Sequence, residues 1–136
     1  MATILKVDEM QGVTSAGDIT ITSEGGSATM QLQQGVVKNW VDAHSDATLN
    51  DSFNTASGTD NGTGDYTYAF TNNMSGTDYA QVSTASWAGL TGFDNGEQTA
   101  SSYNIRGFAR TDSLTVQDLF ITAVVTGDLA LWLVNV

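Results

Sequence analysis

The fold is decided by residues 50–71, NDSFNTASGTDNGTGDYTYAFT, in which two alternating runs flank a bridge of turn-forming residues. In the second run, Tyr66, Tyr68 and Phe70 alternate with small or polar residues, so a strand would place the three rings on one face. Five of the six bridge residues at 60–65 are Asp, Asn or Gly, which tolerate positive φ or hydrogen-bond their own backbone. The stretch therefore predicts a β-hairpin in a half-buried sheet.

Other segments of the chain have the same strand character. Alternating or β-branched runs occur at residues 3–8, 18–22, 36–43, 78–88, 100–110, 114–126 and 128–134. A helix over 114–126 is disfavoured, because branched and aromatic side chains lose rotamer freedom on a helix. We therefore predict an all-β fold, with an antiparallel β-sandwich or jelly-roll-like domain of about seven to eight strands at residues 36–136.

Residues 1–35 are interpreted as a separate, extended N-terminal leader. A leader of this size cannot bury both faces of its strands alone, so we expect it to pack on other chains and to serve attachment or trimerisation. Within it, Ala28, Met30 and Leu32 fit either a short helix capped by Ser27 or a further extended segment. The chain has no proline, which is one common means of protecting sheet edges. We expect a neighbouring subunit to cover those edges, and hence a homo-oligomer.

Composition excludes several classes of function. Four basic residues face fifteen acidic ones in a chain of 136 residues, and a net charge of −11 would repel phosphate backbones and anionic lipid. Nucleic-acid binding is therefore not expected. Cysteine is absent, which excludes disulfides and thiolate sites. The N-terminal residues do not have the pattern of a signal peptide, and no window is apolar for long enough to predict a membrane span.

The sequence offers little for catalysis or metal binding. The acidic bridge at 60–65 lacks the glutamate that closes an EF-hand loop, and a hairpin turn is the simpler interpretation. His44 is the only histidine, so one subunit cannot build a multi-histidine metal site. Neither a G-x-S-x-G motif nor a phosphate-binding glycine loop is present. We expect no enzymatic activity, no metal and no cofactor, and leave open a low-affinity cation site where Asp side chains meet between subunits.

Aromatic side chains are the remaining candidates for binding, because exposed Trp and Tyr stack on sugars or anchor protein partners. Core packing is the default interpretation for each of them. The candidate residues, on the surface or at a subunit interface, are Trp40, Trp87, Phe93, Tyr103 and Trp132. The polar loop at 87–102 is the favoured ligand surface. Arg106 and Arg110 lie four residues apart on a predicted strand and so share a face, where we expect them to pair with acidic groups.

Several short sequence motifs in the chain support a resemblance to a known protein family. The motifs are SFN at residues 52–54, DNGTGDYT at 60–67 and NMSGTDYAQVSTAS at 73–86, and a Lys followed by a Trp-Val pair occurs within VVKNWVDA. With these motifs, about residues 36–128 resemble a β-rich domain of tail-fibre-like virion proteins of phages, especially marine ones. The resemblance implies a structural protein on the exterior of a phage tail or capsid that attaches to a host surface, with a host glycan as a partner.

The expected function is therefore that of a tail-fibre or fibre-tip component, assembled as a homotrimer and joined to other virion proteins through its leader. The chain is far shorter than a typical tail fibre and has no long shaft between leader and sandwich. A capsid decoration or cement protein, which stabilises the head lattice, is the alternative. A carbohydrate-binding module is a third interpretation, based on the predicted sandwich and on the acidic, aromatic composition.

Overall fold

The computed structural model describes residues 4–10, 12–13, 19–22, 26, 28–87, 89–93, 97–109 and 115–129. The chain divides into two compact units, Met1–Val36 and Val37–Val136. In the described ranges every regular element is a β-strand except one short 3₁₀ helix, which confirms the predicted all-β class. The same ranges contain no helix with the length and apolar character needed to cross a membrane.

The first unit contains a two-stranded ribbon. Strand β1 (Thr20–Thr22) pairs antiparallel with β2 (Thr29–Gln31), and the 3₁₀ helix η1 (Leu32–Gly35) follows directly. Ile21 and Met30 face each other across the pair, and all six strand residues are exposed. A two-stranded ribbon is marginally stable by itself in water.

Two expectations for this unit can be compared with the structure. The segment that fitted either helix or strand contains both, because Met30 lies in β2 and Leu32 begins η1, while Ser27 lies outside the described residues. The strand predicted at 3–8 is wrong for the part described, residues 4–8, which has no strand and whose apolar side chains are exposed. Alternation alone does not form a strand where no neighbouring strand pairs with it.

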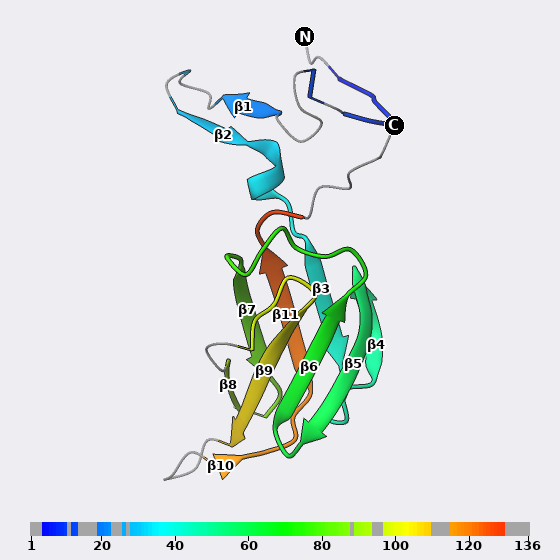
Figure 1. Ribbon diagram of the computed structural model, residues 1–136, viewed down its shortest axis with the longest axis vertical. Coiled ribbons are helices and arrows are strands. Elements are labelled where there is room, and N and C mark those ends of the chain that lie inside the picture. The colour runs from blue at the N-terminus through cyan, green and yellow to red at the C-terminus, as the bar shows by residue number, and fades with distance from the viewer. Residues whose placement is uncertain are drawn as a thin grey trace. The chain divides into compact units, whose positions relative to one another are not determined.

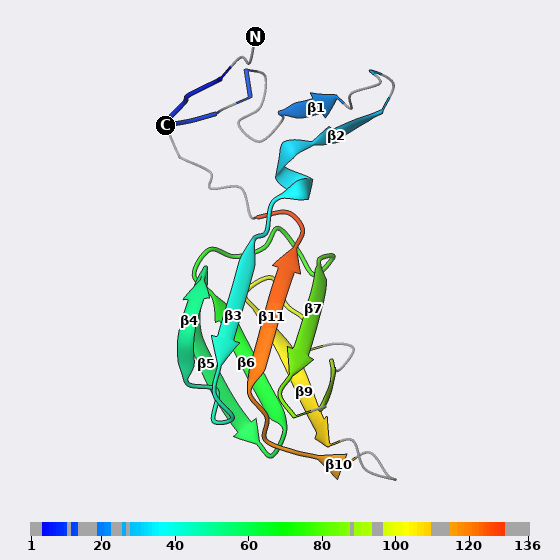
Figure 2. The ribbon, with the colours of Figure 1, turned by 180° about the vertical axis from the view of Figure 1, so that it is seen from behind.

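The second unit is a β-sandwich of two antiparallel sheets, as predicted. The four-stranded sheet has the order β4-β3-β11-β7, with β3 (Asn39–Ala43), β4 (Leu49–Phe53), β7 (Ala80–Ala85) and β11 (Ile121–Thr126). The five-stranded sheet has the order β10-β9-β6-β5, and β8 also pairs with β9; its strands are β5 (Thr55–Gly62), β6 (Asp65–Phe70), β8 (Leu90–Gly92), β9 (Ser102–Ala109) and β10 (Thr115–Val116). Figures 1 and 2 show the two sheets from opposite sides.

The structure has more strands than predicted. The described part of the second unit contains nine, and the whole described chain eleven, instead of seven to eight. Strand β8 lies in a region interpreted as loop, and the strand predicted at 114–126 is divided into β10 and β11 by residues 117–120. This interruption has a physical reason, because Asp118 accepts a hydrogen bond from the Gly64 amide and Leu119 turns into the core, so the backbone leaves the sheet.

The predicted hairpin is confirmed for residues 55–70, whereas residues 50–53, which were predicted to belong to it, lie in β4 of the other sheet. Strands β5 and β6 pair antiparallel on either side of a turn at Thr63 and Gly64, where Gly64 has a φ of 64°. The rings of Tyr66, Tyr68 and Phe70 all point into the sandwich and are buried. Alternation along a strand with one covered face therefore predicted both the element and its inner side.

The core is formed by the inner faces of both sheets. One sheet contributes Val41, Ala43, Ile121, Ala123 and Val125, and the other contributes Tyr66, Tyr68, Phe70, Tyr103 and Ile105. Aromatic rings meet across neighbouring strands, with the centroids of Phe70 and Tyr103 5.3 Å apart and those of Tyr68 and Tyr103 5.6 Å apart. The core of the sandwich therefore contains three buried tyrosines, Tyr66, Tyr68 and Tyr103.

Buried tyrosine hydroxyls differ in how they are satisfied. The hydroxyl of Tyr103 donates to Oδ1 of Asn39 at 2.9 Å, and the amide nitrogen of Asn39 donates onward to the carbonyl oxygen of Phe53 and to Oγ1 of Thr55. The hydroxyl of Tyr68 is buried without a hydrogen-bond partner in the described part of the chain. A buried polar group without a partner lowers stability, so these two tyrosines should respond in opposite ways to loss of the hydroxyl.

We expect Tyr103→Phe to lower the free energy of unfolding by about 1–3 kcal/mol, because it leaves the buried Oδ1 of Asn39 without a donor. Tyr68→Phe, the matched control, should be neutral or stabilising, because it removes an unsatisfied hydroxyl. Urea unfolding of both variants tests this, read as a change in midpoint at constant slope. Equal losses in the two variants would contradict the role of the Asn39 contact.

Strand β3 begins and strand β11 ends at the same end of the sandwich. The Lys38 amide donates to the carbonyl oxygen of Val125 at 2.9 Å, and Asn39 lies opposite Val125 in the register of β3 and β11. The first and last strands of the described sandwich are thus neighbours that run in opposite directions (Figure 1). The other end, where β3 and β7 finish and β11 begins, carries the loop after β3, the turn after β7 and the segment 117–120, with β10 beside them (Figure 1).

Candidate functional site

The loop end of the sandwich contains a cavity of about 390 Å³. It is lined by Ser45, Ser86, Trp87, Gly89, Ala109 and residues 117–120. These residues come from three parts of the chain: the loop after β3, the turn after β7 and the segment that leads into β11, with the end of β9 beside them. Its volume falls within the range of about 300–1,000 Å³ that is usual for small-ligand sites.

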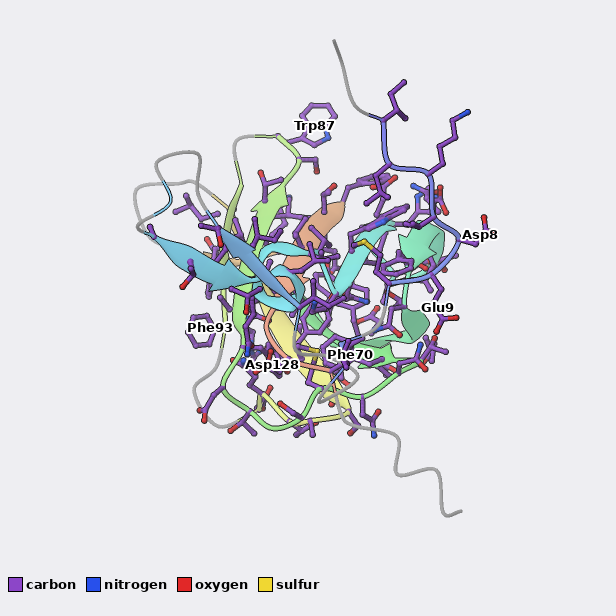
Figure 3. The ribbon with its side chains drawn as sticks, turned by 90° about the horizontal axis from the view of Figure 1, so that it is seen from above. Asp8, Glu9, Phe70, Trp87, Phe93 and Asp128 are labelled. Carbon is purple, nitrogen blue, oxygen red and sulfur yellow. The ribbon has the colours of Figure 1, made fainter. Side chains whose placement is uncertain are left out.

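Trp87 is the most exposed large apolar side chain of this end. Its side chain is 91 % exposed, and Figure 3 shows it pointing away from the sandwich. The turn that carries it is fixed at both sides, because the Ser86 amide donates to the carbonyl oxygen of Phe120 at 3.1 Å and the Gly89 amide donates to that of Ser86 at 3.0 Å. The indole is therefore presented to solvent from an anchored turn.

The backbone at Trp87 has a φ of 60°, in the left-handed region. This conformation is unfavourable for a residue with a bulky side chain and costs about 1–3 kcal/mol. Strain of this kind persists where the surrounding structure imposes it, and it is concentrated at functional sites. An exposed tryptophan in a strained turn contributes little to the core, which makes a binding role the stronger hypothesis.

Asp118 places a carboxylate at the same cavity. Its Oδ1 accepts a hydrogen bond from the Gly64 amide at 2.7 Å and lies 3.4 Å from the hydroxyl of Tyr66. That hydroxyl also accepts a hydrogen bond from the Leu119 amide at 2.9 Å. The segment 117–120 is thereby tied to the hairpin turn, and the carboxylate has a defined position although the residue is exposed.

Further polar groups line the wall. Ser45 and Gln117 are polar residues of the lining, and the Oγ of Ser86 is shielded from solvent without a hydrogen-bond partner among the described residues. Phe120 provides a second aromatic surface, and its ring centroid lies 5.0 Å from that of His44. The cavity thus combines aromatic planes with a few hydrogen-bonding groups, the usual composition of a small-ligand site.

The structure separates the aromatic residues that the sequence proposed for binding. Phe93 is 58 % exposed beyond β8, but Figure 3 shows it at a different margin of the molecule from Trp87, so the two rings do not form one platform. The proposal of Tyr103 for the surface or an interface is wrong, because its ring is fully buried between the sheets. Trp132 lies outside the described residues, and Trp40 is half-buried on the outer face of β3.

Trp40 belongs to a feature that sequence patterns missed. It lies opposite Phe53 of β4 and Val124 of β11, and Val124 in turn lies opposite Val82 of β7. These four residues, the outer-face row, cross the entire four-stranded sheet on the side away from the core. Phe53, Val82 and Val124 are exposed. Alternation could have indicated the outer side of each strand, but the register that aligns them comes from pairings between distant segments.

The charged residues that drew attention in the sequence have structural roles. The Arg106 guanidinium lies 3.0 Å from the Asp65 carboxylate, so the expected pairing with an acidic group occurs within the chain, while Arg110 lies outside the described residues. In the acidic bridge, Oδ1 of Asp60 accepts a hydrogen bond from the Gly62 amide at 2.9 Å. Across the described ranges, no three His, Cys, Asp or Glu side chains gather in a way that could hold a metal ion.

Asp46 shapes the loop beside the cavity. Its carboxylate accepts a hydrogen bond from the Thr48 amide at 3.0 Å, and this contact lowers the pKa of the carboxyl. The same loop is closed by two backbone hydrogen bonds between His44 and its neighbours, from the His44 amide to the Thr48 carbonyl oxygen and from the Ala47 amide to the His44 carbonyl oxygen. The position of Ser45 at the cavity wall follows from this turn.

Comparisons with protein-family models, with curated proteins and with solved structures give no match to this chain.

Proposed function

We propose that the chain is a non-enzymatic structural protein of a phage virion, a tail-fibre or fibre-tip component that attaches the particle to a host surface. The observation that carries this proposal is that the two ends of the sandwich differ in what they present. Strand β3 begins and strand β11 ends at one end, and the cavity with the exposed Trp87 lies at the other. A module held at one end and equipped for binding at the other suits a protein that reaches outward from a particle.

The first unit supports the proposed assembly. Both strands of its ribbon have exposed side chains throughout, and a ribbon of this size is too small to be stable alone. We propose that the leader packs on sister chains in a homotrimer and on other virion proteins. The exposed Ile21 and Met30 would then be covered in the assembled particle.

Electron cryomicroscopy of the whole virion tests this function. We expect density for the chain at the tail appendages, and we expect the purified chain to bind susceptible host cells and to slow adsorption of the phage. A host strain resistant to adsorption is the matched control and should bind no chain. Absence of the chain from the particle, or equal binding to both strains, would contradict the proposal.

A second candidate function is supported by the outer-face row. A capsid decoration protein needs a flat surface that packs on the head lattice, and an apolar row across an exposed sheet face suits such an interface. In this arrangement the four-stranded sheet would face the lattice and the cavity would be secondary. Density on the capsid lattice instead of the tail would favour this function over the first.

A further inference from the structure

We propose that the cavity at the loop end binds an uncharged or amino-substituted sugar ring, which stacks on Trp87 and hydrogen-bonds to the polar wall. This inference deepens the proposed function by naming the ligand class at the same site, but sugar binding can be measured on the purified chain without reference to a virion. It is based on the shape of the cavity, the presentation of the indole and the sign of the charge.

The indole supplies a flat apolar surface. The C–H groups on one face of a sugar ring carry small positive partial charges, which are attracted to the negative face of an aromatic ring. Trp87 is 91 % exposed and lies at the edge of a cavity of about 390 Å³, so one face of the indole can accept a ring that also enters the cavity. The strained backbone at Trp87 fixes this presentation in advance, which reduces the entropy lost on binding.

The wall supplies groups that match sugar hydroxyls. Asp118 offers carboxylate oxygens as acceptors, and its position is set by the hydrogen bond from the Gly64 amide. Gln117 and Ser45 can both donate and accept. A hydroxyl group does the same, so adjacent hydroxyls of one ring can be paired without leaving a buried group unsatisfied.

Charge restricts the class of sugar. Asp118 places a negative charge at the cavity, and the whole chain carries a net charge of −11. Sulfated sugars and uronic acids would be repelled both at the site and at long range. Neutral sugars are tolerated, and a protonated amino group would be attracted to the Asp118 carboxylate.

A panel of oligosaccharides tests the inference. Neutral hexose and N-acetylhexosamine oligomers, amino-sugar oligomers with free amines, and sulfated or uronic oligomers of matched length are titrated against the full chain, with tryptophan fluorescence and calorimetry as readouts. We expect binding of at least one oligomer from the neutral or amino groups and none from the anionic group. Comparison of the amine with its N-acetylated form identifies which of the two the site prefers.

Three variants separate binding from folding. Trp87→Ala should weaken binding about tenfold or more, while Phe93→Ala, an exposed aromatic elsewhere on the surface, should leave affinity unchanged. Trp87→Gly should also lose binding, yet its urea midpoint should equal or exceed that of the parent chain, because glycine adopts the left-handed conformation without strain. Loss of affinity without loss of stability is the result that a structural role of Trp87 would not produce.

The inference is overturned if no neutral or amino oligomer binds, if anionic oligomers bind better, or if Trp87→Ala binds as the parent chain does. The experiments can refute the sugar site without refuting the proposed attachment function. A chain that binds no sugar but still lies at the tail and binds host cells removes the sugar site and leaves the attachment function. A chain that binds sugar but is absent from the virion removes the attachment function and leaves the sugar site.

Discussion

Gly58→Ala is expected to destabilise the sandwich by about 3 kcal/mol, a large part of the total stability of an ordinary domain. Gly58 lies in β5, and a Cβ at this position would overlap the backbone carbonyl oxygen of Ala47 and press on the ring of Tyr68. Neither neighbour can move easily. Ala47 is held in a hydrogen-bonded turn with a φ of 63°, and Tyr68 is fully buried.

Gly76→Ala is the matched control for this substitution. A Cβ at Gly76 meets no atom within 4 Å, and its backbone is not in the left-handed region, so the change should stay within about 0.5 kcal/mol of zero. Urea unfolding of both variants gives the comparison. Similar midpoints for the two variants would mean that β5 and the β3–β4 turn do not approach each other as closely as the structure has them.

The second large effect is expected at alkaline pH. The chain has four tyrosines, and all four pack in the sandwich core or against it. Burial raises the pKa of Tyr66 to about 12, partly offset by the hydrogen bond from the Leu119 amide, and burial raises the pKa of Tyr79 to about 12 as well. Burial also raises the pKa of Tyr68 and of Tyr103.

The sign of the pH dependence follows from these directions. Tyrosines of the unfolded chain ionise near pH 10, whereas the folded chain keeps them protonated. The stabilising contribution is therefore complete below about pH 10 and is lost as the pH rises through about 12. We expect the sandwich to persist to about pH 10 and then to unfold cooperatively as the tyrosines ionise together.

Two signals followed in one titration test this expectation. The ultraviolet absorbance of tyrosinate and the far-ultraviolet circular dichroism should change over the same pH interval. This interval should lie at higher pH than the one in which the tyrosines of the chain ionise in concentrated urea. The urea-unfolded chain is the control and should titrate near pH 10. Tyrosinate absorbance that rises near pH 10 with unchanged circular dichroism would contradict burial of the tyrosines.

Local patterns predicted the parts of the fold that depend on neighbouring residues. The turn at 60–65 and the alternation of Tyr66, Tyr68 and Phe70 lie within one short segment, and both were predicted correctly, whereas residues 50–53 pair with β3 in the other sheet. Strands β7 and β9 were found for the same reason, each within a few residues of its bounds. Tyr103 was kept as a binding candidate, although its alternation with Ile105 placed both on one face, because an aromatic residue can serve either a core or a surface.

Features that depend on distant segments could not be predicted. The cavity requires Ser45, Trp87 and Asp118 to meet, and they belong to three loops separated along the chain by complete strands. The break between β10 and β11 depends on a contact between Asp118 and Gly64, which lie 54 residues apart. The outer-face row likewise needs the pairings of β3 with both β4 and β11. Sequence periodicity gives the side of a strand but not its partner.

Among the described residues, the first and last strands of the sandwich, β3 and β11, are direct neighbours. Because Asn39 and Val125 are direct partners in an antiparallel pair, the start of β3 and the end of β11 lie side by side, with these two Cα atoms about 5 Å apart. A domain with this geometry can be inserted into a surface loop of another protein without forcing the flanking segments apart. The same geometry allows the module to be exchanged between host chains, or replaced in one step by a module of different specificity, while the scaffold that carries it stays unchanged.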